Sequence, residues 1–211
     1  MDFLPEKLQE YIEQHSRYEG ELLYQLERET YQKVLMPRMV SGHIQGQVLR
    51  MLSLMIKPTT ILEIGTFTGY SGICLAEGLK DHGKLITIDI NKELEDMVKS
   101  YFKNSGFESQ IDYRIGNAMH IIPTLACNFD LVFIDADKIN YSNYFDLVID
   151  KVNSGGFILA DNVLWSGKVI ESKPDVDTRA LIAFNDKIQK DTRVENVLFP
   201  VRDGIMVMRK I

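Results

Sequence analysis

The stretch TILEIGTFTGYS, residues 60–71, sets the expected fold class. It joins a short apolar run, Thr60–Ile64, through a turn that contains two glycines to a candidate helix at Tyr70–Lys80. A buried strand that leads through such a turn into a helix is typical of a parallel α/β sheet. In open sheets of this kind, ligands bind beyond the carboxyl ends of the strands. We therefore expect the functional residues where strands end.

The alternation of strands and helices continues along the chain. Apolar runs predict further strands at Lys84–Ile90, Ile111–Ile115, Asp130–Asp135 and Phe157–Asp161. Further helices are expected at Lys92–Ser105, Ile121–Leu125 and Tyr141–Val152, with Gly106 and the run Asn153–Gly156 as helix-ending signals. Runs that are apolar nearly throughout are typical of parallel strands covered on both faces.

The C-terminal segment follows a different pattern. A helix is expected at Asp177–Asp191, and two apolar runs, residues 194–201 and 205–211, then flank a turn at residues 202–204. This arrangement predicts a closing antiparallel hairpin. The expected fold is thus a doubly wound, mostly parallel seven-stranded α/β sheet, Rossmann-like, with a C-terminal antiparallel hairpin.

The first 57 residues are expected to form a helical extension. Leu4, Leu8 and Ile12 fall at helical spacing, a second helix follows around Leu22–Leu26, and a third spans about Ile44–Ile56. No linker or repeat separates this part from the rest. We therefore expect one domain over residues 1–211, with a helical extension at 1–57 and an α/β core at 58–211.

Composition and charge limit the class of protein. Of 211 residues, 45% are hydrophobic and 26% are charged, which argues against wholesale disorder. The formal net charge of −6 makes a general nucleic-acid-binding surface unlikely on electrostatic grounds. The two cysteines, Cys74 and Cys127, have no metal-binding spacing, and the acidic N-terminus does not resemble a signal peptide. These features predict a cytoplasmic protein.

The glycine-containing turn indicates a nucleoside ligand. Gly65 and Gly69 let the backbone turn tightly and approach a ligand, and Asp89 ends the next strand, where a carboxylate can accept both ribose hydroxyls. The dinucleotide pattern GxGxxG requires a glycine where this chain has Phe67, which disfavours a nicotinamide-dependent oxidoreductase. The alternative is that the two glycines only make a strand-to-helix turn.

A second group of polar residues follows two later strands. Asp135, Asp161 and Asn162 would bring three hard oxygen ligands to neighbouring strand ends. This set suits Mg²⁺, with Ca²⁺ or Mn²⁺ as alternatives, better than zinc. The alternative reading is a solvated acidic rim.

Several motifs together resemble one enzyme family. ILEIGTFTGYS (61–71), GNA (116–118), FIDADKINY (133–141) and ADNVLWSGKV (160–169) are similar to the cation-dependent O-methyltransferases, which include caffeoyl-CoA and catechol O-methyltransferases and bacterial relatives. The resemblance runs from ERET at 27–30 to RDG at 202–204, nearly the whole chain.

The resemblance implies S-adenosylmethionine as methyl donor, and a homodimer. Within the implied binding set, Glu63, Gly65 and Ser71 would hold the methionine part of the donor and Asp89 its ribose. The complete set is Met39, Ser41, Glu63, Gly65, Thr66, Ser71, Asp89, Asn117, Ala118 and Asp135.

The same resemblance assigns roles on the acceptor side. Asp135, Asp161 and Asn162 match the metal ligands, and Asp135 is also counted with the catalytic residues. Lys138 matches the general base, although a surface ion pair with Asp137 is the open alternative. Tyr141 and Trp165 match positions that shape the acceptor pocket.

The acceptor is the least constrained part of the prediction. The short chain leaves little room for insertions, which favours a small catechol or hydroxylated phenol. The alternative is 5-hydroxyuridine at the wobble position of tRNA, which offers the same two adjacent oxygens. A non-catalytic binding module would keep Asp89 but would not need the combined set Asp135, Asp161, Asn162 and Lys138.

Overall fold

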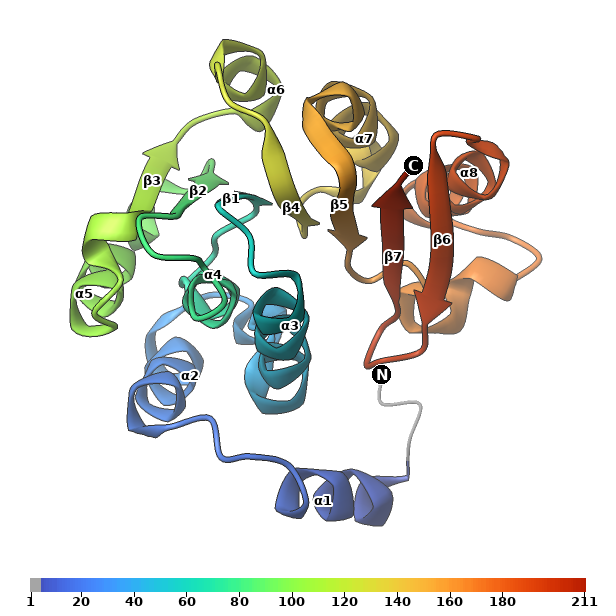
Figure 1. Ribbon diagram of the computed structural model, residues 1–211. Coiled ribbons are helices and arrows are strands. Elements are labelled where there is room, and N and C mark those ends of the chain that lie inside the picture. Colours follow the sequence, from blue (N-terminus) through green and yellow to red (C-terminus); the bar gives the residue numbers. More distant parts are fainter. Residues whose placement is uncertain (1–4) are drawn as a thin grey trace. The chain divides into compact units, whose positions relative to one another are not determined.

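The computed structural model describes residues 5–211 (Figure 1), so the predicted contribution of Leu4 to the first helix lies outside the described residues. The described chain divides into two compact units, residues 5–117 and 118–211. The expected helical extension is present in the first unit as α1 (Glu6–Gln14), α2 (Glu21–Lys33) and α3 (Gly42–Ile56). A 3-10 turn at Pro37–Met39 separates α2 from α3 because proline interrupts a helix.

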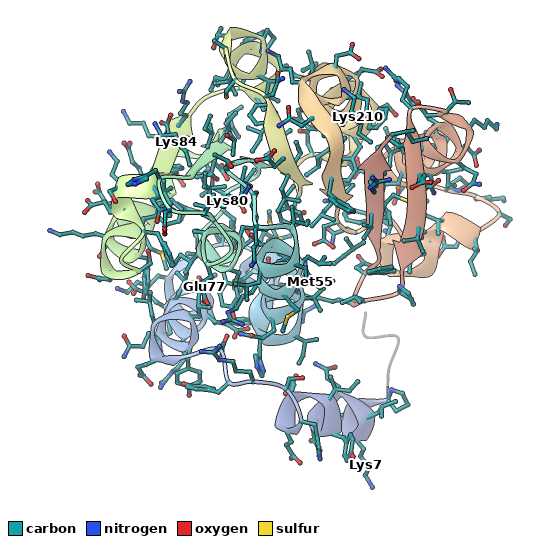
Figure 2. The ribbon with its side chains drawn as sticks, in the orientation of Figure 1. Lys7, Met55, Glu77, Lys80, Lys84 and Lys210 are labelled. Carbon is teal, nitrogen blue, oxygen red and sulfur yellow. The ribbon has the colours of Figure 1, made fainter. Side chains whose placement is uncertain are left out.

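The first unit also holds three parallel strands. They are β1 (Thr60–Ile64), β2 (Lys84–Asp89) and β3 (Ile111–Ile115), each where the sequence predicts it to within a residue. The pairing aligns Ile64 with Ile88 and Asp89 with Ile115, so the ends of these strands meet at one edge. Lys84, labelled in Figure 2, begins β2 and marks its opposite end.

Two helices connect these strands. The glycine-containing turn leads into α4 (Tyr70–Ala76), which packs against α3 (Figure 1). The second connection is α5 (Glu95–Asn104), preceded by a 3-10 turn at Lys92–Leu94. Gly106 follows α5 with a φ of +81°, in agreement with its predicted helix-ending role.

The second unit holds the remaining strands. β4 (Phe129–Ile134) and β5 (Val152–Ala160) are parallel, whereas β7 (Ile205–Lys210) is antiparallel to both β5 and β6 (Val194–Phe199). Its helices are α6 (Ala118–Ile121), α7 (Tyr141–Val148) and α8 (Val176–Lys190). Short 3-10 segments lie at Glu108–Gln110, Ile122–Thr124, Lys138–Asn140, Ile149–Lys151 and Trp165–Ile170.

Three local predictions are wrong: the helix expected at Ile121–Leu125 is a 3-10 segment after the earlier α6, the strand expected from Phe157 begins at Val152, and the glycine-containing run before it is no helix end. The run Asn153–Gly156 does not lie in a loop after a helix but within β5. The β4–β5 register shifts there, since Phe129 pairs with Val152 while Leu131 already pairs with Phe157. Glycine signals are local, and here strand pairing overrides them, with Gly155 at a φ of +79° absorbing the irregularity.

The predicted fold class is confirmed. The strands form a seven-stranded sheet in the order β3-β2-β1-β4-β5-β7-β6, parallel except at the C-terminal hairpin. Its central strands are buried nearly throughout, as their apolar sequences require. Among the described residues, no helix is both long and apolar enough to span a membrane.

Candidate active site

A buried carboxylate organises the turn after β1. The Glu63 side chain is fully buried, and its two oxygens accept hydrogen bonds from the Ser71 hydroxyl at 2.6 Å and the Thr87 hydroxyl at 2.5 Å. At Gly72 there is no room for a side chain, because a Cβ would lie 2.9 Å from Glu63 Oε2. A buried carboxylate is tolerable when it is hydrogen-bonded, and this one fixes the start of α4 to β1 and β2.

The turn itself is held by Asp89 at the end of β2. The backbone N–H of Phe67 donates to Asp89 Oδ2 at 2.6 Å, and that of Asn91 donates to Oδ1 at 2.8 Å. Phe67 has a φ of +49°, which is unfavourable for a residue with a side chain, so its hydrogen bond supports a strained position. Gly65 and Gly69 also have positive φ, as their predicted role requires.

The other predicted methyl-donor residues occupy different environments. Thr66 is buried, with its hydroxyl 2.6 Å from that of Thr87. Met39 is 59% exposed, whereas Ser41 is buried just before α3. Asn117, the last residue of the first unit, is exposed, and Ala118 begins the second unit as a buried residue of α6.

Lys138 lies at the centre of the second group. Its side chain is buried, and its ammonium donates to Asp135 Oδ1 at 3.1 Å, Asn162 Oδ1 at 2.8 Å and the Tyr141 hydroxyl at 2.6 Å. The structure thus does not show the alternative, a surface ion pair with Asp137. Asp135 and Asn162, expected at the ends of β4 and β5, are thus brought together around the Lys138 ammonium.

This arrangement fits a divalent cation. Oxygens of Asp135 and Asn162 already converge on one positive charge, and Asp161 lies between them in the chain with only 2% of its surface exposed. Carboxylate and amide oxygens are ligands that hard cations prefer. No group of three or more His, Cys, Asp or Glu residues suited to a metal occurs in residues 5–211, and here only two of the three predicted ligands are of those types.

Tyr141 lies beneath the lysine. Its side chain is fully buried, and its hydroxyl donates to the Asp161 carbonyl at 2.9 Å. Burial, followed by the nearby Asp135 charge, raises the pKa of Tyr141 well above its ordinary value, so the phenol stays neutral. Its predicted part in the acceptor pocket stays a prediction.

Trp165 stands beside the same ammonium. Lys138 Nζ lies 5.6 Å from the centre of its indole ring, within the range of a cation–π interaction. The indole N–H is buried and has no hydrogen-bond partner among the described residues. Buried donors are usually satisfied, so this group is suited to a ligand or to water.

Sequence reasoning missed three residues that support these groups. Thr87 is the second partner of Glu63, and Thr30 on α2 has its hydroxyl 3.2 Å from that of Thr68 in the turn. Asp203 accepts a hydrogen bond from the backbone of Ser166. Thr30 and Asp203 do lie in the motifs ERET and RDG. The neighbouring sequence, however, does not predict which distant residues they contact.

The sheet has the Rossmann-like architecture, and comparison with known proteins assigns the class, the methyltransferases. A model of the O-methyltransferase family matches residues 13–211. Caffeoyl-CoA O-methyltransferase 1 of Eucalyptus globulus is 37% identical over 186 residues, which cover 82% of this chain and 75% of that protein.

Solved structures agree with this assignment. An SAH-bound methyltransferase of Podospora anserina is 26% identical with a TM-score of 0.90, covering 100% of this chain and 99% of that one. An O-methyltransferase of Bacillus cereus in complex with SAH is 26% identical with a TM-score of 0.89 and covers 97% of both chains.

The chain therefore belongs to the O-methyltransferase family that includes the plant caffeoyl-CoA enzymes. It is an S-adenosylmethionine-dependent O-methyltransferase.

Proposed function

We propose that this enzyme methylates one of two adjacent oxygens on a small catechol or hydroxylated phenol, with the help of a divalent cation. The observation that carries this proposal is the convergence of Asp135, Asn162 and Tyr141 on the buried Lys138 ammonium. The names of the plant relatives support a phenolic acceptor, since they include caffeoyl-CoA O-methyltransferases and a tricin synthase.

The methyl donor is proposed to bind at the turn after β1. Asp89 has spare acceptor capacity on both oxygens for the ribose hydroxyls, while Glu63 and Ser71 shape the turn from below. The remaining proposed contacts are Met39, Ser41, Gly65, Thr66, Asn117, Ala118 and Asp135. SAH in two solved relatives supports this part of the proposal.

Asp135, Asp161 and Asn162 are the proposed cation ligands, with Mg²⁺ as the expected ion and Ca²⁺ or Mn²⁺ as alternatives. A cation bound there would lower the pKa of an acceptor hydroxyl, as metals do for bound water. Two carboxylates and one amide leave ligand positions for two acceptor oxygens.

Lys138 is proposed as the general base. As a neutral amine it would take the proton from the acceptor hydroxyl, while the oxygen forms a bond to the methyl carbon and the sulfur–carbon bond breaks. The Tyr141 hydroxyl accepts from this nitrogen at 2.6 Å and would keep it in place when the cation takes the Asn162 oxygen, so its approach to the acceptor is restricted. Positioning of this kind accounts for up to about 7–11 kcal/mol of barrier reduction in well-aligned reactions.

Trp165 is proposed to line the acceptor pocket. Its flat ring beside Lys138 suits stacking on an aromatic acceptor, and its buried N–H can donate to an acceptor oxygen. We also propose that residues 1–211 act as one methyltransferase domain, as a family match from 13 to 211 suggests, and that the enzyme is a homodimer.

The test is transfer of labelled methyl groups from S-adenosylmethionine to a panel of catechols and, in parallel, to tRNA that carries unmethylated 5-hydroxyuridine. Each reaction is run with Mg²⁺ and with a chelator. We expect transfer to a catechol that the chelator abolishes. Transfer only to tRNA would overturn the acceptor, and transfer that survives the chelator would overturn the cation's role. Asp161→Asn serves as the ligand variant, and Asp146→Asn, on the exposed side of α7, is its control.

A further inference from the structure

The RDG sequence at residues 202–204 makes an unusually shaped turn between β6 and β7. Arg202 has a φ of +49° and Gly204 a φ of +86°, and the Gly204 N–H donates to the Val201 carbonyl at 2.9 Å. None of the proposed methyl-transfer chemistry uses Asp203.

The loop that carries the acceptor-side residues is strained. It follows β5, and Asn162, Trp165, Ser166 and Gly167 in it all have φ values between +47° and +79°. Only Gly167 adopts such a φ without steric cost. A loop with three side-chain-bearing residues in this region persists only where its surroundings fix it.

The RDG turn supplies those surroundings. Asp203 Oδ1 accepts from the Ser166 N–H at 2.5 Å, and the Asp203 carbonyl accepts from the Leu164 N–H at 3.0 Å. The Gly204 carbonyl accepts from the Val163 N–H at 3.1 Å. A Cβ on Gly204 would lie 2.5 Å from Leu164 Cγ, so the loop packs directly on this glycine.

These contacts fall on both sides of Trp165. They hold Val163 and Leu164 before it through main-chain bonds, and Ser166 after it through the one side-chain bond. Of the hydrogen bonds that the RDG turn makes to this loop, only the one to the Asp203 carboxylate depends on a side chain, and Asn185 adds a side-chain bond from α8 to the Val163 carbonyl. Near it, the loop turns through the consecutive left-handed residues Trp165 and Ser166.

We propose that Asp203 is a positioning residue of the acceptor site, because its bond to the Ser166 N–H fixes the loop that presents Trp165 and Asn162 to Lys138. This inference rests on the proposed function, because it assumes that the acceptor binds beside Lys138. Asp203 itself takes no part in the proposed methyl transfer. Loss of the carboxylate lets the left-handed residues relax, and Trp165 then moves away from the ammonium.

The structural test uses fluorescence. Trp165 is the sole tryptophan of the chain, so its emission reports on this loop alone. In Asp203→Ala we expect a red-shifted emission and stronger quenching by acrylamide, with neither substrate present. Asp203→Asn keeps an oxygen that can accept from Ser166 and should restore the parent spectrum.

The matched control is Asp191→Ala. Asp191 likewise accepts a backbone N–H, that of Arg193 at 3.0 Å, in the turn before β6. It should leave Trp165 emission unchanged. If Asp203→Ala does not fold, Asp203→Glu displaces the carboxylate by one methylene and should give the same change in quenching.

The kinetic test separates the two substrates. In Asp203→Ala we expect kcat/KM for the acceptor to fall by up to about 10²-fold, the size of an ångström-scale misplacement, with the KM of the methyl donor unchanged. Unchanged quenching in both Asp203→Ala and Asp203→Glu would overturn the proposal. So would equal losses for acceptor and donor, which indicate a general structural role. The fluorescence result stands even if catechols prove not to be substrates, so the two proposals fail separately.

Discussion

The turn after β1 buries the Glu63 carboxylate completely, whereas Asp135 at the end of β4 keeps 22% of its side chain exposed, and the two carboxylates are stabilised differently. Glu63 is satisfied by the neutral hydroxyls of Ser71 and Thr87. Asp135 is satisfied by the ammonium of Lys138, at the end of a long side chain. The first arrangement is complete and rigid without a ligand. The second is balanced by a positive charge, so another cation could compete for the same oxygens.

Removing the Lys138 ammonium should have the largest effect on activity. In Lys138→Ala we expect turnover to fall by roughly 10²–10⁴-fold, the usual contribution of a general base, with little change in methyl-donor affinity. Single-turnover methyl transfer and a separate donor-binding titration measure the two. Lys168→Ala is the control, since Lys168 also lies near Trp165, at 5.9 Å, but pairs with Asp175. Unchanged turnover in Lys138→Ala would remove this lysine from the mechanism.

Removing the Glu63 carboxylate should lower the stability of the protein. Glu63→Ala removes the acceptor of two buried hydroxyls, of which Thr87 keeps Thr66 as a partner and Ser71 loses its bond, and we expect the free energy of unfolding to fall by about 2–3 kcal/mol. Glu63→Gln keeps the shape and one acceptor and should lose less. Urea unfolding followed by circular dichroism measures both.

The control for Glu63 is Glu77→Ala. Glu77, labelled in Figure 2, pairs with Arg50, but its side chain is 30% exposed. Water reaches this pair in part, since Arg50 keeps 12% of its side chain exposed, so a smaller loss of about 1 kcal/mol is expected. Equal losses at Glu63 and Glu77 would mean that the buried network adds nothing beyond a partly exposed ion pair.

The positions of the site residues can be predicted from the sequence, but their hydrogen-bond partners cannot. Asp89, Asp135, Asp161 and Asn162 can be placed because Asp89 ends β2 and the other three follow the ends of β4 and β5, where ligands of such sheets bind. The partners inside each group depend on side-chain geometry instead. No spacing rule says that Lys138 turns toward Asp135 rather than Asp137.

Long-range supports are beyond sequence patterns for a related reason. The Asp203 carboxylate meets the Ser166 backbone across 37 residues of chain, a contact that exists only once the hairpin has paired with β5. The error at Asn153–Gly156 has the same origin. Local glycine signals predict a turn, but pairing with β4 decides the outcome.

The smallest expected effect is also the most direct test of charge exchange at the Lys138 site. If the ammonium and a divalent cation compete for the oxygens of Asp135 and Asn162, Lys138→Met should bind Mg²⁺ more tightly than the parent. We expect about a tenfold tighter apparent Kd, equivalent to about 1.4 kcal/mol, and a correspondingly larger rise in Tm on adding Mg²⁺. Lys168→Met should respond as the parent does. An equal rise in Tm for all three proteins would show that the ammonium does not compete with the cation, and the two acidic sites would then be equally fixed.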